Sequence, residues 1–235
     1  MLAVNTLVGF WAGSPAGTSP TPPSNPLNAW QHDSLADIHT DNAGSDDLSF
    51  WFGLPALVGG KDGDGIEWDA SSIYAIQSGL VTGDFSAVGW LKPGGDFSGS
   101  NIVPWSLRSG AYDISLEMSD ASTDGECEVS VTWDDGTNSG SLDFTGLNDS
   151  DWFFFAIVAD MGVGLTVRIN STTQSDTSTP PNITGAMDLR LNTDSDFSGG
   201  GSVVADEFLM WHGSLRTAAE LDYLYNGGAG RFYPW

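Results

Sequence analysis

Apolar and polar residues alternate along several short segments of this chain. In ECEVSVTW, residues 126–133, Cys127 and every second residue after it are apolar, whereas the residues between them are polar. Successive side chains of a strand point to opposite faces, so this segment predicts a half-buried antiparallel strand. The segments at 165–170 and 187–191 repeat the pattern, and residues 152–158 are apolar on both faces, which indicates a central strand.

Turn residues separate these strand-like segments. The segment that begins at Phe85 ends in KPGGDFSG, and residues 126–133 are followed by DDGTNSG, which has the composition of a hairpin loop. From Phe85 onward such segments recur at short intervals, as they do in β-sandwiches. We therefore predict an all-β fold, an antiparallel two-sheet sandwich of about a dozen strands.

One helix is predicted near the C-terminus. Thr217 and Glu220 have the spacing of a capping box, in which each side chain bonds to the other residue's backbone N–H. The residues that follow Thr217 favour a helix, and Gly227 with Gly228 ends it. The sandwich is therefore expected to carry one short C-terminal helix.

The length suits a single domain covering residues 1–235, because sandwiches of this size are common as one unit. Ten Trp and twelve Phe provide enough apolar surface for a large core. Residues 13–28 are rich in Gly, Ser, Thr and Pro without periodicity, which predicts a loop or arm, and residues 229–235 form an aromatic tail.

The charge is strongly unbalanced, since 31 acidic residues against 7 basic ones give a formal net charge of −24. Nucleic acid and anionic membranes are poor partners for such a chain, because phosphate binding needs clustered Lys and Arg. Calcium, or solubility in a salty medium, is easier to reconcile with it. No apolar run reaches the length of a membrane span, so we expect no membrane insertion.

The N-terminus and the single cysteine bear on location. The first residues, MLAVNTLVGFW, lack a basic region and reach a Gly-Ser-Pro stretch too soon for a signal peptide. Cys127 is the only cysteine, which excludes an intrachain disulfide and favours a small buried side chain over a reactive thiol. We therefore expect either a virion surface location or an extracellular fragment of a larger secreted protein.

Several segments, taken in order, resemble a known family. VVADEFLMWHGSLRTAAELDYLYNGGAG, at 203–230, is similar to the closing segment of laminin G-like domains. FSAVGWLKPG, DWFFFAIV, LVGFW, DIHTDNAGSDDLS and GDGIEWDASSIYAI resemble other segments of that family. The chain departs from it at Trp68, where Phe is usual, and at Ala70, where Gly is usual.

The resemblance implies a jelly-roll sandwich of the concanavalin A-like lectin and glucanase superfamily. It implies the fold more strongly than the function, because one fold hosts many functions. Variants with a similar opening loop occur in bacteriophage virion proteins and in environmental secreted proteins.

Asp206 and Asp41 are the candidate metal ligands. Asp206 alternates onto an apolar face of its strand, where an unpaired carboxylate is costly to bury. The resemblance implies a Ca²⁺ near this strand, with Asp41 of the opening loop brought close to it. The alternative is that backbone N–H groups satisfy the carboxylate.

Catalysis is not expected. The resemblance admits glycan hydrolysis, but the strand motif Glu-x-Asp-x-x-Glu of such enzymes is missing. Glu126 and Glu128 share one strand face about 6.6 Å apart, without a third acid beside them, so we interpret them as a solvated face. The chain also has no Gly-x-Ser-x-Gly segment to accompany His32, His39 or His212.

Carbohydrate binding needs aromatic rings beside polar loops, because the CH faces of sugars stack on Trp and Tyr. Trp51, Trp105, Tyr112 and Trp133 are the candidates, since they lie near predicted strand ends. The alternative for each is a place in the core, where most Trp residues of a sandwich lie.

The aromatic tail suggests assembly. Arg231, Phe232, Tyr233 and Trp235 present a large apolar surface unless they pack on their own domain or on a neighbour. The first hypothesis is therefore a non-catalytic virion-surface structural or decoration protein, a homo-oligomer or part of a larger viral assembly, with a lectin-like fold that binds glycans for attachment. The alternative is a secreted or cell-surface carbohydrate-binding module, and a glycoside hydrolase is a distant third.

Overall fold

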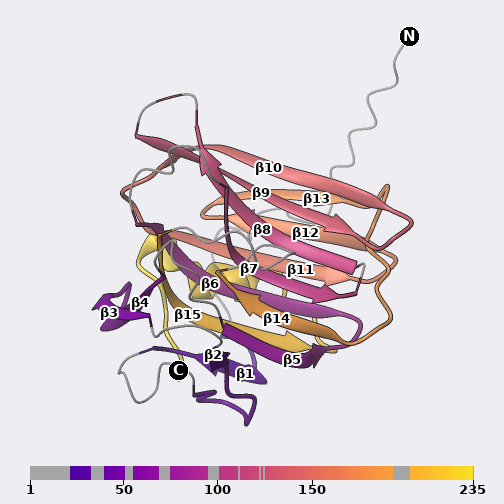
Figure 1. Ribbon diagram of the computed structural model, residues 1–235, viewed down its shortest axis with the longest axis horizontal. Coiled ribbons are helices and arrows are strands. Elements are labelled where there is room, and N and C mark those ends of the chain that lie inside the picture. The colour runs from indigo at the N-terminus through magenta and orange to yellow at the C-terminus, as the bar shows by residue number, and fades with distance from the viewer. Residues whose placement is uncertain are drawn as a thin grey trace.

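The computed structural model describes most of the chain: residues 22–32, 40–50, 55–68, 75–94, 101–110, 112–121, 123, 125–192 and 202–234. In this part, fifteen strands form two stacked antiparallel sheets and one short α-helix follows the last strand (Figure 1). The predicted all-β sandwich with a C-terminal helix is therefore confirmed. Residues 1–21, with the segment LVGFW, lie outside the described residues, and the assignment of 1–235 to one domain stays a prediction.

The first sheet has eight strands. Seven follow the order β13 (Thr172–Asp176), β12 (Gly164–Ile169), β11 (Phe153–Asp160), β6 (Phe85–Pro93), β15 (Val203–His212), β4 (Asp64–Trp68) and β3 (Ala56–Gly59). The eighth, β1 (Asn28–Trp30), also pairs with β15. Strands β6, β11 and β15 are buried along almost their whole length, as their apolar sequences predict.

The second sheet has seven strands. Their order is β10 (Ser139–Asn148), β9 (Glu126–Asp134), β8 (Tyr112–Asp120), β7 (Ile102–Ser109), β14 (Met187–Leu191), β5 (Ala75–Val81) and β2 (Ser49–Phe50). Strand β9 alternates between buried and half-buried residues, and β14 does the same, so the predicted period of two is confirmed. One face of this sheet is therefore in the core, and the other is polar.

The core lies between the sheets and is formed by their inward residues. Cys127, Val131, Leu165 and Val167 have no exposed surface. Burial raises the pKa of the Cys127 thiol to about 11. This agrees with a small apolar side chain in the core rather than a reactive thiolate.

A second apolar cluster covers the outer face of the eight-stranded sheet. Helix α1 (Ala218–Tyr225) is capped by the predicted pair, since Glu220 N donates to the Thr217 hydroxyl and Thr217 N donates to the Glu220 carboxylate. Leu221 and Leu224 of the helix pack on outward residues of β6, β11 and β15. The central strands β6, β11 and β15 are therefore buried on both sides, whereas the seven-stranded sheet keeps a polar outer face.

Candidate functional site

The outward face of the seven-stranded sheet carries polar residues on several neighbouring strands. On β8, Ile114, Leu116 and Met118 are fully buried, so the residues between them point outward. The same alternation directs polar residues outward on β9, β10, β7 and β14. We call the outward side of these five strands the polar face.

Strand register arranges the polar face in two rows. One row crosses the five strands and is called the charged row: Ser139, Asp134, Asp113, Arg108 and Asp188 are successive cross-strand partners. The next is called the hydroxyl row: Ser141, Thr132, Ser115, Ser106 and Arg190. Because neighbouring strands lie about 4.8 Å apart, each row is about 19 Å long.

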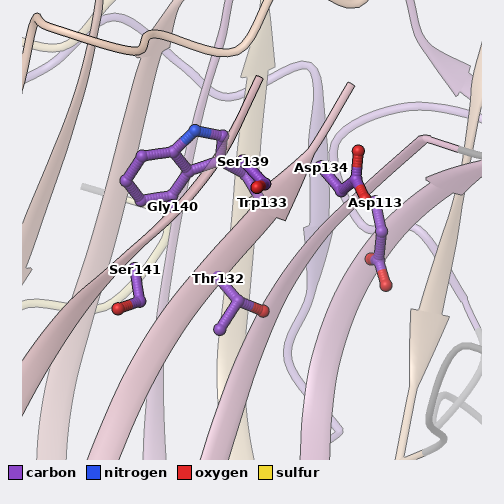
Figure 2. Close-up of a pocket in the computed structure, with 7 residues that line it drawn as sticks. All are labelled: Asp113, Thr132, Trp133, Asp134, Ser139, Gly140 and Ser141. Carbon is purple, nitrogen blue, oxygen red and sulfur yellow. The ribbon is translucent and has the colours of Figure 1, made fainter. Parts of the chain in front are cut away.

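An open hollow of about 410 Å³ lies at the β8–β10 end of the polar face. Figure 2 shows the carboxylates of Asp113 and Asp134 on one side of it and the Trp133 ring on the other. The residues that line it are Asp113, Thr132, Trp133, Asp134, Ser139, Gly140 and Ser141. Carboxylates, hydroxyls and an aromatic edge therefore meet in one depression.

Gly140 makes room for Trp133 beside the hollow. A Cβ atom at Gly140 would lie 2.3 Å from the indole ring, so no other residue fits without moving it. The indole N–H donates to the Thr179 carbonyl at 2.9 Å, which fixes the ring. The shape of the hollow thus depends on a glycine and on a backbone contact from a distant loop.

The electrostatics of the polar face centre on Asp113. It lies directly opposite Asp134 on one side and Arg108 on the other. Burial raises the pKa of Asp113, the Ser115 hydroxyl, Arg108 and Arg190 oppose the rise, and the neighbouring Asp134 adds to it. The Ser115 hydroxyl donates to Asp113 at 2.5 Å, so this carboxylate is held in place.

The chain resembles known proteins in its fold but not in its sequence. No protein-family model matches the chain, and no curated protein matches it in sequence. Domain 4 of AbnA, a GH43 extracellular arabinanase from Geobacillus stearothermophilus solved in complex with arabinotriose, matches with a TM-score of 0.65 and 17% identity, over 88% of this chain and 98% of that one. The likeness extends over nearly all of both chains and concerns the fold.

Binding domains of botulinum neurotoxins match to a similar degree. The receptor binding domain of mosaic serotype C/D has a TM-score of 0.64 and 15% identity, over 86% of this chain and 51% of that one. The type G receptor binding domain has a TM-score of 0.63 and 16% identity, with the same coverage. The chain thus spans about half the length of the neurotoxin domains, and identities this low concern the fold alone.

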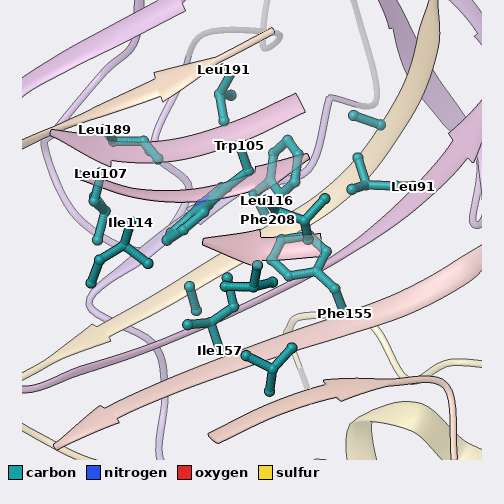
Figure 3. Packing of buried hydrophobic residues seen from close by; sticks show 14 of the residues in the cluster. Leu91, Trp105, Leu107, Ile114, Leu116, Phe155, Ile157, Leu189, Leu191 and Phe208 are labelled. Carbon is teal, nitrogen blue, oxygen red and sulfur yellow. The ribbon is translucent and has the colours of Figure 1, made fainter. Parts of the chain in front are cut away.

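The predicted aromatic platforms lie in different environments. Trp133 borders the hollow, although only 2% of it is exposed, and Tyr112 is half-buried beside Asp113 at the start of β8. Trp105 is 1% exposed, and Figure 3 shows its ring between the sheets, so it offers no face on which a sugar could stack. Its place is in the core, as the alternative proposed. Trp51 lies outside the described residues.

The two candidate metal ligands are held by different loops. Asp41 accepts N–H groups from Ala29, Ala43, Gly44 and Asp46 and from the Asn28 side chain, at 2.7 to 3.2 Å. Both of its oxygens therefore face donors. A cation at the same lone pairs would have to displace these donors, so Asp41 fits Ca²⁺ poorly.

Asp206 is satisfied in a comparable way. One carboxylate oxygen accepts the N–H groups of Lys61 and Asp62 at 2.8 and 3.0 Å, from the hairpin that joins β3 and β4. Among the described residues, no group of three or more His, Cys, Asp or Glu is arranged to hold a metal ion. The backbone alternative describes both carboxylates, and a calcium ion stays a proposal.

The described part of the tail lies against its own domain. Phe232 and Tyr233 belong to the apolar cluster on the outer face of the eight-stranded sheet. The Arg231 guanidinium lies 4.6 Å from the centre of the Tyr223 ring, and the Tyr233 carbonyl accepts from Gln31. Trp235 lies outside the described residues. The described part of the tail thus packs on a sheet face of its own domain, in line with the alternative to assembly.

A substitution in the tail tests whether it stabilises its own domain or forms contacts between subunits. Phe232→Ala is expected to lower the free energy of unfolding by about 1–2 kcal/mol, because Phe232 is half-buried on its own domain. Chemical denaturation measures this loss, and Leu27→Ala, at a side chain that is 50% exposed, is the matched control. A change of oligomeric mass by light scattering with unchanged stability would instead favour the assembly role.

Most residues of the hollow were missed by sequence reasoning. Alternation marks Thr132 as outward, but it does not show that Asp134, Asp113 and Arg108 are cross-strand neighbours. That information lies in the register between strands.

Glu126 and Glu128 point outward from β9 and are half-buried. No helix in the described segments is long and apolar enough to cross a membrane.

Proposed function

We propose that this chain is a non-catalytic, lectin-like domain that binds carbohydrate on the polar face of its seven-stranded sheet. The observation that carries the proposal is the pair of in-register rows around an open hollow. The outer face of the other sheet is covered by α1 and the tail. The polar face is therefore the broad sheet surface left for a ligand.

The chemistry of the rows suits a polyhydroxylated ligand. Carboxylates such as Asp113 and Asp134 accept hydrogen bonds from sugar hydroxyls, and Arg108 and Arg190 donate to them. In the hydroxyl row, the accessible hydroxyls of Thr132 and Ser141 do both, whereas Ser106 and Ser115 are buried.

The structural neighbours support the same class of ligand. The arabinanase domain was solved with arabinotriose, and one botulinum neurotoxin binding domain was solved in complex with SialylT. The arabinanase neighbour is also described as extracellular, which agrees with an extracellular or virion-surface location for this chain. These likenesses do not name a sugar.

The finer assignments rest on sequence. The ordered motifs support a laminin G-like member of the concanavalin A-like superfamily, of the kind found in phage virions and secreted proteins. A net charge of −24 suits a domain that faces solvent. The proposed setting is a virion-surface decoration protein in a larger assembly, and the alternative is a secreted or cell-surface module. Mass spectrometry of purified virions tests the first setting.

Binding is tested with a glycan panel and two variants. Asp113→Ala and Asp134→Ala are each expected to weaken binding of the best glycan by at least about tenfold, because each removes a charged hydrogen-bond acceptor. Calorimetry measures the dissociation constants. Asp64→Ala, at an exposed position on β4, is the control that should bind as the native protein does.

Two results would contradict the proposal. One is a folded native protein that binds nothing on the panel, and the other is binding that neither variant weakens. The same panel with and without calcium, followed by the melting temperature, tests whether a metal at Asp41 or Asp206 supports the fold.

A further inference from the structure

The polar face carries far more negative than positive charge. Its described outward positions hold seven carboxylates against two guanidinium groups. The carboxylates are those of Asp113, Glu117, Glu126, Glu128, Asp134, Asp143 and Asp188, and the guanidinium groups are those of Arg108 and Arg190. A ligand on this face therefore meets an acidic surface.

The other basic side chains of the described residues lie away from the polar face. Arg168 pairs with Asp222 at 2.6 Å, and Arg216 pairs with Glu220 at 3.1 Å, both at helix α1. Arg231 lies over a tyrosine of that helix, and the Lys61 ammonium lies over the Trp90 ring of β6, 4.5 Å from its centre. These four basic side chains lie on the side of the eight-stranded sheet, and the fifth, Lys92, belongs to β6 of that sheet.

The two arginines of the polar face have acidic neighbours. Arg108 lies between its cross-strand partners Asp113 and Asp188. Arg190 lies diagonally across from Arg108, and its guanidinium is 3.8 Å from the Asp188 carboxylate. The two positive charges are therefore balanced by Asp113 and Asp188, and Asp134, Asp143 and the glutamates leave the face negative.

We infer that the polar face selects neutral glycans and rejects glycans that carry carboxylate or sulfate groups; this inference rests on the proposed function. An ionised group of the ligand would approach Asp134 and Asp113, which already face each other across neighbouring strands. Neutral hydroxyls meet the same carboxylates as hydrogen-bond donors without this repulsion.

The alternative is that Arg108 and Arg190 bind an acidic sugar, because a guanidinium group can donate two parallel hydrogen bonds to one carboxylate. The number and position of the surrounding acids decide against it. A ligand carboxylate at Arg108 would lie one strand away from both Asp113 and Asp188. It would also have to compete with them for the same guanidinium.

The test compares matched ligands. A panel holds neutral oligosaccharides, including lactose and arabinotriose, beside sialylated, uronate-containing and sulfated counterparts. The neutral member of each pair that binds is expected to bind at least about tenfold more tightly at low ionic strength. The difference is expected to shrink as salt is added, because salt screens like charges. Equal or tighter binding of the acidic members overturns the inference, even though the face then still binds glycans.

Two double variants test whether the charges of the polar face cause the preference for neutral glycans. Glu117→Gln with Asp143→Asn removes two charges from the polar face at positions that do not line the hollow, and the amide oxygens can still accept from Thr132 and Ser141, which do line it. This variant should narrow the difference between acidic and neutral glycans about threefold or more. Asp64→Asn with Asp151→Asn removes two exposed charges elsewhere and should leave the difference unchanged. Equal effects of the two double variants would contradict a local origin. Absence of binding to every glycan would overturn the proposed function itself.

Discussion

Gly89→Ala is expected to lower the free energy of unfolding by about 3 kcal/mol, because the core has no room for a methyl group at this position. A Cβ atom at Gly89 would lie 2.5 Å from the Phe208 ring and 2.7 Å from the Phe155 ring. Both rings are fully buried, so neither can move into solvent. Urea denaturation followed by tryptophan fluorescence measures the loss.

The strand register explains why a glycine is needed there. Gly89 pairs with Phe155 on β11, and on the other side it faces a bulge of β15, where two residues, Glu207 and Phe208, oppose one. The two phenylalanine rings meet over the bare glycine, 6.0 Å apart between their centres. Figure 3 shows them side by side in the core.

Gly59→Ala is the matched control for this prediction. A Cβ atom at Gly59, on the edge strand β3, meets no atom within 4 Å, so this variant should keep native stability. Phe208→Leu in the Gly89→Ala background should recover part of the loss, because it removes the ring in the way. Equal stability of the Gly59 and Gly89 variants would show that the packing around Gly89 is not as described.

Asp41→Ala is expected to cost a similar amount, about 3 kcal/mol, because it leaves the buried donors of Asn28 and Ala29 and three backbone N–H groups of the loop without an acceptor. The Asp41 carboxylate joins β1 to the loop at 40–47, since it accepts from Asn28 and Ala29 and also from backbone groups of the loop. Gly44 allows this approach, because a Cβ atom there would lie 2.5 Å from the carboxylate.

Thermal unfolding with and without calcium measures this effect. The stability of Asp41→Asn should lie between those of the native protein and Asp41→Ala, because its amide keeps one accepting oxygen and turns a donor toward the remaining N–H groups. Asp64→Asn, at an exposed position, should leave stability near native. If calcium strongly stabilises the native protein but not the Asp41→Ala variant, Asp41 binds a metal ion, and its main role is not to anchor the loop.

Local pattern was enough for the main features of the fold. The alternation at 126–133 predicts strand β9 and its buried face because a strand repeats every two residues, whatever it pairs with. The capping box of Thr217 and Glu220 predicts the start of α1, because both bonds are made within four residues. These predictions needed no knowledge of the neighbouring strands.

The site could be predicted only in fragments. Trp133 was a candidate and borders the hollow, whereas Trp105 had the same kind of sequence position and lies in the core. A tryptophan near a strand end has no local signal for the side on which its ring lies. Asp113 and Arg108 were not candidates, because each is an ordinary polar residue of an alternating strand.

The sequence by itself determined a two-sheet β-sandwich with acidic outer positions and a capped C-terminal helix, since period-two burial, charge and capping are local properties. The tertiary structure decided that Arg108 lies between Asp113 and Asp188, because β14 joins the sheet beside β7 from a distant part of the chain. It also decided that the tail and α1 cover one sheet and leave the other open. Register and layer order arise from long-range packing, which no short segment encodes.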